Sequence, residues 1–264
     1  MITKHIRRVI LFAMFIYLPF CSMAWGVLGH RIVGGIADGY LTKKAKKEIY
    51  KILGNESIAI TSTWSDFVRS DPAYDYLDPW HYINIKGGVN EIDFRKKLAA
   101  DTAIDAFTKL NQVIAKLKTG TLTPEEKLFN LRVLIHIVGD IHQPMHVARP
   151  EDRGGNGIKL QWFNSPTSLH TIWDSKLVDF QQLSYTEYVQ SINFTTKLQR
   201  KEWQSESITD WIWQSYQYTE KIYAETKADA NLSYDYNFKF IGILNQQLLK
   251  GGVRLAGLLN EIFG

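Results

Sequence analysis

The stretch that decides the fold is His136-Ile-Val-Gly-Asp-Ile-His-Gln-Pro-Met-His146, which carries three histidines and a carboxylate among mostly apolar residues. A second stretch, Leu169-His-Thr-Ile-Trp-Asp174, begins 23 residues after the first one ends. Each stretch contains a His and an Asp four residues apart. Four residues is about one helical turn, so each pair can project from one face of a helix. Imidazole and carboxylate groups are ligands that suit zinc, and ionisable groups on buried helices commonly hold a metal.

The first stretch ends a helix whose beginning is clearly marked. Thr123-Pro-Glu-Glu126 offers a capping Thr, Pro at the first helical position and Glu three residues after the cap. This helix should run to about Gln143, because Pro144 cannot continue it. Residues 128–141 are apolar nearly all round, which predicts the central buried helix of the domain.

Helical periodicity dominates the rest of the chain. We expect an all-α fold, a single mostly helical domain over residues 25–264, with at most a short β excursion. The expected helices cover 28–53 with a break near 39–42, 58–69, 94–117, 169–180, 208–226 and 238–262. Short strands or extended loops fit 80–85 and 159–163.

Residues 1–24 have the pattern of a cleaved signal peptide. Lys4, Arg7 and Arg8 precede an apolar stretch, 9–20, that is too short for a comfortable membrane span, and Ser22-Met-Ala24 supplies small residues for cleavage. Cleavage after Ala24 would make Trp25 the mature N-terminus. We therefore expect a secreted or periplasmic protein without a stable membrane anchor, the alternative being an uncleaved anchor.

Removal of this segment changes the charge argument. The chain has 31 basic and 27 acidic side chains, and the segment takes away three basic ones and no acidic one. The mature protein is therefore nearly neutral, and any attraction to phosphate must be local. Cys21, the only cysteine, leaves with the segment, so the mature protein has no disulfide.

Six histidines lie after residue 24, and four of them fall within the two stretches that also carry spaced aspartates. A lone His on an apolar face is more often a hydrogen-bonded core residue, but this clustering favours a metal. His142 lies two residues from Asp140 and points to another side of the helix, so we interpret it as a supporting or structural residue. A mature Trp25 would offer its α-amine, which titrates near neutral pH, and its carbonyl as metal ligands close to His30.

Several motifs follow one another in the order that is typical of one known family. They are Trp25-Gly-x-x-Gly-His30, Trp64-Ser-Asp66-x-x-Arg69, His81-Tyr-Ile-Asn84, His136-Ile-Val-Gly-Asp140, Gln143-Pro-Met-His146, Gly154-Gly-Asn156 and His170-x-x-x-Asp174. The chain resembles the zinc-dependent nucleases of the S-one/P-one type, which are secreted nucleases and 3'-nucleotidases. The resemblance implies a mostly helical domain around a trinuclear zinc cluster.

The resemblance also implies which residues hold three zinc ions per chain. One ion would be held by Asp66, His81, His136 and Asp140. A second would be held by Trp25, His30 and Asp140, with Asp140 bridging the two, and a third by His146, His170 and Asp174. Spacing alone does not choose Asp66 over Asp71, Asp75 or Asp78.

The implied reaction is hydrolysis of phosphodiester bonds in single-stranded RNA and DNA to 5'-phosphate products, together with hydrolysis of 3'-nucleotides. Asp140 would act at the catalytic centre, and Arg69 would pair with phosphate oxygens. Tyr82 would stack on a base, and Asn84 and Asn156 would contact substrate. Fungal members carry Asp at the position of Asn84, and Asn donates as well as accepts, which leaves the base preference open.

Two other functions fit parts of the pattern. A zinc phospholipase C would use the same cluster on a lipid phosphate ester, but the Trp-Ser-Asp and Gly-Gly-Asn motifs favour the nuclease. A non-catalytic zinc-binding protein would normally close its zinc with four protein ligands, whereas these ligand sets leave open positions. We expect the protein to be a monomer.

Overall fold

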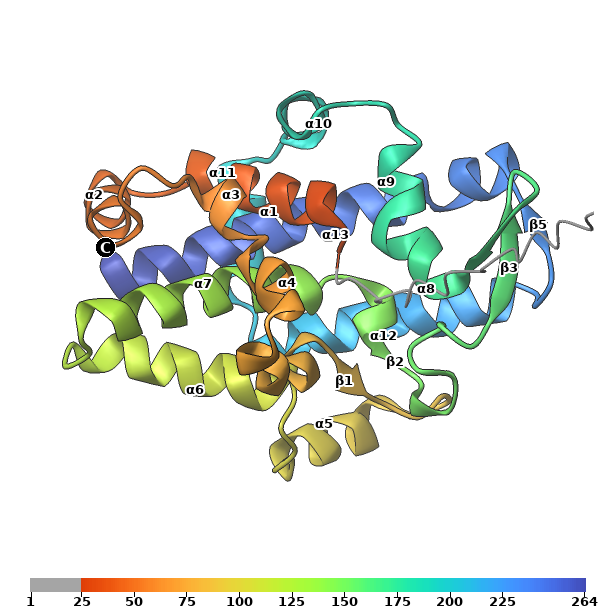
Figure 1. The fold of residues 1–264 in the computed structure, drawn as a ribbon, viewed down its shortest axis with the longest axis horizontal. Coiled ribbons are helices and arrows are strands. Elements are labelled where there is room, and N and C mark those ends of the chain that lie inside the picture. The colour runs from red at the N-terminus through yellow and green to blue at the C-terminus, as the bar shows by residue number, and fades with distance from the viewer. Residues whose placement is uncertain (1–24) are drawn as a thin grey trace, which may run out of the picture.

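The computed structural model describes residues 25–264, and within them it is mostly helical (Figure 1). The long helices are α1 (Val27–Gly39), α2 (Lys43–Leu53), α5 (Glu91–Ala99), α6 (Ala106–Thr119), α7 (Pro124–Asp140), α10 (Tyr185–Ile192), α11 (Lys197–Ser205), α12 (Ile208–Glu225) and α13 (Tyr234–Phe263). Shorter helical turns are α3 (Ile58–Thr61), α4 (Trp64–Phe67), η1 (Val68–Ser70), η2 (Pro72–His81), η3 (Pro144–His146), η4 (Pro150–Asp152), α8 (Leu169–Thr171), η5 (Ile172–Lys176) and α9 (Leu177–Asp179). The predicted helical fold class is confirmed.

The β structure is small, as predicted. Strands β1 (Ile83–Asn84) and β2 (Val147–Ala148) pair in parallel, with Ile83 opposite Val147. A three-stranded sheet has the order β4-β3-β5, in which β3 (Lys159–Trp162) pairs antiparallel with β4 (Ser165–Ser168) and parallel with β5 (Asn231–Leu232). The β1–β2 pair matters for the site because it joins the segment after His81 to the segment after His146.

Helix α7 is the central helix that the sequence predicted. Its capping box is present, since Thr123 accepts from the Glu126 amide and Glu126 accepts from the Thr123 amide. Every residue from Val133 to Asp140 is buried, with α1, α6 and α13 packed around the helix. It ends at Asp140, three residues earlier than expected, because a turn over residues 141–143 precedes Pro144.

Two predicted continuous helices are wrong. The helix expected over 58–69 is divided into α3, α4 and η1, because the hydroxyls of Ser62 and Thr63 bond back to the carbonyls of Ala59 and Ile60. The helix expected over 94–117 is divided into α5 and α6. There Asp105 accepts from the Thr108 amide, so it acts as an N-cap in place of a residue within a helix.

The expected signal peptide, residues 1–24 with its cleavage point at Ala24, lies outside the described residues. Within residues 25–264, no helix combines the length and the apolar character needed to cross a membrane.

Helices α1 and α13 approach closely enough to require glycine. A Cβ at Gly252 of α13 would lie 2.5 Å from the Ile36 Cβ and 3.0 Å from the Val33 carbonyl oxygen on α1. Gly252→Ala should therefore destabilise the fold by about 1–3 kcal/mol through overpacking. Gly242, on the same helix, has nothing within 4 Å of the equivalent position.

Gly242→Ala is the matched control, and it should leave stability unchanged or raise it by up to about 1 kcal/mol through helix propensity. Urea unfolding followed by circular dichroism measures both variants. Equal stability of the two variants would contradict the close packing of α1 on α13.

Candidate metal centre

The end of α7 places two predicted ligands side by side in the core. His136 and Asp140 are both fully buried, and the His136 Nε2 lies 3.2 Å from the Asp140 Oδ2. The i, i+4 spacing read from the sequence therefore produces the expected pair on one helix face. Both side chains lie next to His30 and His81, two predicted ligands from other segments.

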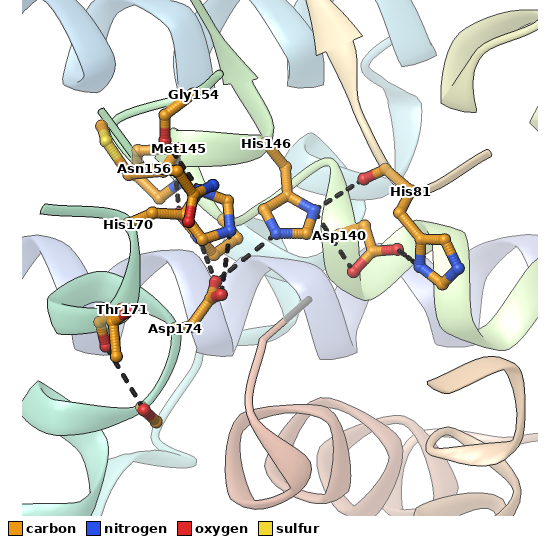
Figure 2. Close-up of polar contacts among 12 residues, drawn as sticks. His81, Asp140, Met145, His146, Gly154, Asn156, His170, Thr171 and Asp174 are labelled. Carbon is orange, nitrogen blue, oxygen red and sulfur yellow. Dashed lines mark hydrogen bonds and ion pairs between the residues drawn. The ribbon is translucent and has the colours of Figure 1, made fainter. Parts of the chain in front are cut away.

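Four imidazoles surround the Asp140 carboxylate. Its Oδ2 lies 3.2 Å from both the His81 Nδ1 and the His136 Nε2, and its Oδ1 lies 3.3 Å from the His30 Nε2 and 3.6 Å from the His146 Nδ1. These histidines come from α1, η2, α7 and η3. Figure 2 shows Asp140 between His81 and His146. Its role as a ligand that bridges two ions stays a prediction.

Asp66 is the acidic residue of its segment that reaches this group. Its oxygens lie 3.9 Å from the His30 Nε2 and 4.0 Å from the His136 Nε2. Two of the alternatives have other roles, since Asp71 caps η2 through the Ala73 amide and Asp78 pairs with Arg69. This choice required the tertiary structure, because the spacing of these aspartates did not make it.

A separate group is formed by His146, His170 and Asp174. The Asp174 Oδ2 lies 2.9 Å from the His170 Nε2, and its Oδ1 lies 3.4 Å from the His146 Nε2. His170 and Asp174 lie on the continuous α8–η5 segment, where a π-helical turn covers Asp174. All three side chains are buried, and Figure 2 shows them facing one another.

Backbone carbonyls fix the orientation of three of these rings. The Nδ1 of His136 donates to the Ser62 carbonyl (2.7 Å), that of His146 to the His81 carbonyl (2.6 Å) and that of His170 to the Gly154 carbonyl (2.7 Å). Each ring then presents its Nε2 to the cluster. Metal-binding histidines are commonly held in this way, because the second nitrogen fixes the tautomer and the ring plane.

The residues fit metal ions, because many of their buried polar atoms have no hydrogen-bond partner. Among the described residues, such atoms include both ring nitrogens of His30, the Nε2 of His81, His146 and His170, both oxygens of Asp66 and the Oδ1 of Asp140. A buried polar atom without a partner is costly, so a native protein rarely keeps several of them together. A cation that accepts nitrogen and oxygen ligands would satisfy the whole set.

The ligand atoms form three compact groups, which are His30, Asp66 and His136; His81, His136 and Asp140; and His146, His170 and Asp174. Within each group the ligand atoms lie within 4.8 Å of one another. The third group contains the same residues as the third predicted zinc set. The first two groups combine the other predicted ligands differently from the first two predicted sets. The assignment of individual residues to individual ions stays a prediction.

A cavity of about 590 Å³ opens beside these groups. His81, His146 and His170 form part of its lining, so the metal groups face its interior. The volume lies within the range of small-molecule sites, so part of a substrate can enter.

Comparisons with known proteins agree with this geometry. The family model for the S1/P1 nucleases matches residues 25–264. The chain is 27% identical to Endonuclease 2 of Arabidopsis thaliana over 98% of each chain, and 26% identical to Nuclease P1 of Penicillium citrinum over 91% of this chain and 98% of that one. It is 30% identical to Nuclease S1 of Aspergillus oryzae over 59% of this chain and 55% of that one.

The chain belongs to the S1/P1 nuclease family. It is therefore a nuclease, a hydrolase that acts on phosphodiester bonds, and its substrates are nucleic acids. The resemblance recognised in the sequence is confirmed. The family is metal-dependent, which agrees with the His/Asp groups described above.

The four residues predicted on the substrate side of the nuclease all line the cavity. They are Arg69, Tyr82, Asn84 and Asn156. Arg69 connects the cavity wall to the metal groups, because its Nη1 lies 3.7 Å from Asp66 and its Nε lies 3.2 Å from Asp78. Tyr82 is 41% exposed, so its ring is accessible to a base.

Trp25 lies close to His30, one of the predicted metal ligands of the nuclease. It is fully buried, and the amide of the next residue, Gly26, donates to the Asp174 carbonyl (2.7 Å). A Cβ at Gly139 would lie 2.7 Å from the His30 Nδ1 and 3.8 Å from the Trp25 Cδ1. The Trp25 side chain thus lies against α7 close to His30. Its role as a metal ligand through the α-amine and the carbonyl stays a prediction.

Burial and neighbouring charges shift the pKa values of the His and Asp groups in different directions. Burial opposes ionisation of Asp140, but the surrounding histidines, chiefly His136, hold its pKa well below the usual range. Burial lowers the pKa values of His30 and His81, so these rings are neutral ligands at pH 7. Burial also acts to lower the pKa of His136, but Asp140 and Asp66 outweigh it and raise this pKa to about 9.

Gln143 is a residue whose role the sequence did not reveal. Its side-chain Nε2 donates to the Asp174 Oδ1, and its Oε1 accepts from the Met145 amide. Gln143 therefore connects the turn after α7 to Asp174, a predicted metal ligand 31 residues further along the chain. The sequence contained one signal for this role, because Gln143 lies directly before Pro144 within the Gln-Pro-Met-His motif.

His142 lies outside the metal groups, as the sequence predicted. Its Nδ1 donates to the Val138 carbonyl (2.7 Å) and its Nε2 accepts from the Arg254 Nη1 (2.8 Å), so both ring nitrogens are used. Burial and the Arg254 charge hold the pKa of His142 well below its usual value, which keeps the ring neutral.

Two histidines four residues apart therefore make a matched pair for substitution. His146→Gln should lose about one equivalent of bound metal, because it removes a ligand nitrogen. His142→Gln should keep the full metal content but lose about 1–3 kcal/mol of stability, since the buried Arg254 Nη1 loses its acceptor. Metal analysis and urea unfolding measure the two effects, and equal metal loss in both variants would refute the distinction.

Proposed function

We propose that the chain is a zinc-dependent endonuclease that hydrolyses single-stranded RNA and DNA to 5'-phosphate products and also hydrolyses 3'-nucleotides. The observation that carries this proposal is the row of buried His and Asp groups that opens into the cavity lined by Arg69, Tyr82 and Asn84. A cluster of ligands beside a cationic and an aromatic side chain suits a phosphate ester attached to a base.

Zinc is the proposed metal because the ligand atoms are imidazole nitrogens and carboxylate oxygens. Asp140 would bridge two ions, with Asp66, His81 and His136 on one and His30 and the α-amine of Trp25 on the other. His146, His170 and Asp174 would hold a third ion. Bound zinc supplies hydroxide from water at neutral pH and neutralises charge that develops on phosphate and on the leaving oxygen.

The side chains of the cavity would bind and orient the substrate. Arg69 presents its guanidinium from the wall next to Asp66, where it can form paired hydrogen bonds to phosphate oxygens. Tyr82 follows the ligand His81 directly, so a base stacked on its ring would hold the adjacent phosphate near the metal groups. Asn84 and Asn156 can each donate to and accept from the nucleotide.

The depth of the ligands favours unpaired strands. His81, His146 and His170 are at most 5% exposed, so a phosphate must enter the cavity to reach them. A base in a duplex would have to leave its stack first, and this costs energy that an unpaired base does not require. Export through a cleaved signal peptide and action as a monomer belong to the same proposal, since the α-amine of Trp25 exists only after cleavage.

The activity test uses the mature protein that begins at Trp25. It should release 5'-mononucleotides from RNA and denatured DNA much faster than from duplex DNA, lose this activity with a chelator and regain it with zinc. Loss of a residue that only supports a metal ligand lowers activity by up to roughly 100-fold. Asp140→Asn alters a predicted ligand itself, so it should lower the rate by more than this. Chromatography of the products measures both effects.

Circular dichroism provides the control that Asp140→Asn remains folded. The proposed function would be refuted if the zinc-restored wild-type protein released no nucleotides from denatured DNA or RNA.

A further inference from the structure

A second wall of the cavity carries two cations that have no role in the proposed function. This wall is formed by the turn after η4 and by the first residue of β3, where Arg153 and Lys159 line the cavity. Both side chains are exposed. The opposite wall carries Arg69 and Tyr82, so the cavity has a cation on each side.

The two cations of this wall lack acidic partners. Within residues 25–264, neither Arg153 nor Lys159 forms an ion pair. The acidic residue in the cavity lining is Asp78, and its carboxylate pairs with the Arg69 Nε at 3.2 Å. Two cations on a concave surface without counter-charges produce a local positive potential that attracts an anion.

Hydrogen bonds hold the two cations on one structural unit. The Asn156 Nδ2 donates to the Arg153 carbonyl (2.8 Å), and the Lys159 Nζ donates to the Asn156 carbonyl (3.1 Å). Asn156 therefore links the two cations. This arrangement places both of them on the same side of the cavity without neutralising either charge.

The backbone at Arg153 has a left-handed conformation, which is unfavourable for residues that have a Cβ. Its φ is +57°, and the next residues, Gly154 and Gly155, have φ values of +62° and +82°. A Cβ at Gly154 would lie 2.5 Å from the Met145 carbonyl oxygen, so that position requires glycine. Left-handed backbone strongly favours Gly or Asn, and an Arg kept in this conformation points to a use for its side chain.

The turn that carries Arg153 also positions a predicted metal ligand. The Gly154 carbonyl accepts from the His170 Nδ1 at 2.7 Å. Figure 2 shows Gly154 and Asn156 beside His170 at one end of the row of ligands, with His81 at the other end. Arg69 lies beside Asp66 and Tyr82 directly follows His81, so both belong to the His81 end, and Arg153 and Lys159 lie across the metal groups from them.

We propose that Arg153 and Lys159 bind a second backbone phosphate of a single-stranded nucleic acid, adjacent to the phosphate that is hydrolysed. This inference rests on the proposed function and adds that the enzyme favours substrates with at least two phosphates over those with one. Each phosphate contact by Lys or Arg releases condensed counterions, so the contact contributes a measurable salt dependence.

The experiment compares two substrates that differ by one nucleotide, and so by one phosphate: a dinucleoside monophosphate and the trinucleoside diphosphate of the same base. The variants, made in the mature zinc-loaded enzyme, are Lys159→Ala and Arg153→Asn, because Asn tolerates the positive φ. Lys47→Ala is the control, since Lys47 is exposed on α2, at the opposite end of the molecule from β3 in Figure 1.

On the trinucleoside diphosphate, we expect Lys159→Ala and Arg153→Asn each to lower kcat/KM about 10-fold, the loss of one hydrogen bond to a charged group. The plot of log(kcat/KM) against log(salt concentration) should become shallower by about 0.7 per contact removed. On the dinucleoside monophosphate, both variants should match the wild type, as should Lys47→Ala on either substrate. Arg153→Asn should not lower the melting temperature, because it relieves backbone strain.

Equal losses on the two substrates would overturn the inference while leaving the proposed function intact, because Lys159 and Arg153 would then serve the metal centre or the fold. Losses of the same size in Lys47→Ala would overturn it in favour of a general charge effect. A wild-type enzyme that cleaves neither substrate would refute the proposed function, and this inference with it.

Discussion

The rest of the structure depends on the burial of the Asp140 carboxylate among four imidazoles. No atom of Asp140 is exposed, and nitrogens of His30, His81, His136 and His146 lie within 3.6 Å of its oxygens. An ionised group at this depth is tolerated only where opposite charge or strong ligands surround it. Helices α1 and α7 and the turns η2 and η3 must therefore meet at one point, and this requirement explains why the long helices pack around α7.

The turn after Asp140 is supported from behind by α12 and α13. The Ser215 hydroxyl, the Gln247 amide and the Thr219 hydroxyl donate to the backbone carbonyls of residues 141, 142 and 144. Arg254, which is fully buried, bonds to His142 and to Glu206 in the same layer. The C-terminal helices thus satisfy the polar groups of the segment that connects Asp140 to His146, and this fixes the separation of the two metal groups.

Local signals in the sequence predicted part of this arrangement. The capping box at Thr123 and the periodicity of α7 were sufficient to place His136 and Asp140 on one buried face, and the next His/Asp pair followed the same rule. The break between α3 and α4 was not predictable, because the Ser62 carbonyl there accepts from His136, 74 residues away. Asp66 likewise could not be chosen among neighbouring aspartates, since its distance from His30 and His136 arises only in the tertiary structure. The turn at Arg153 combines a local Gly-Gly signal with contacts to Met145 and His170 that spacing does not reveal.

Anomalous diffraction at the zinc absorption edge, from crystals of the mature protein beginning at Trp25, tests the central claim most directly. The account predicts three peaks per chain. Two should contact Asp140 from opposite oxygens, one of them within bonding distance of the Trp25 amine, and the third should lie among His146, His170 and Asp174. A single peak, or three peaks of which none contacts Asp140, would contradict the claim that this carboxylate is the centre of the site.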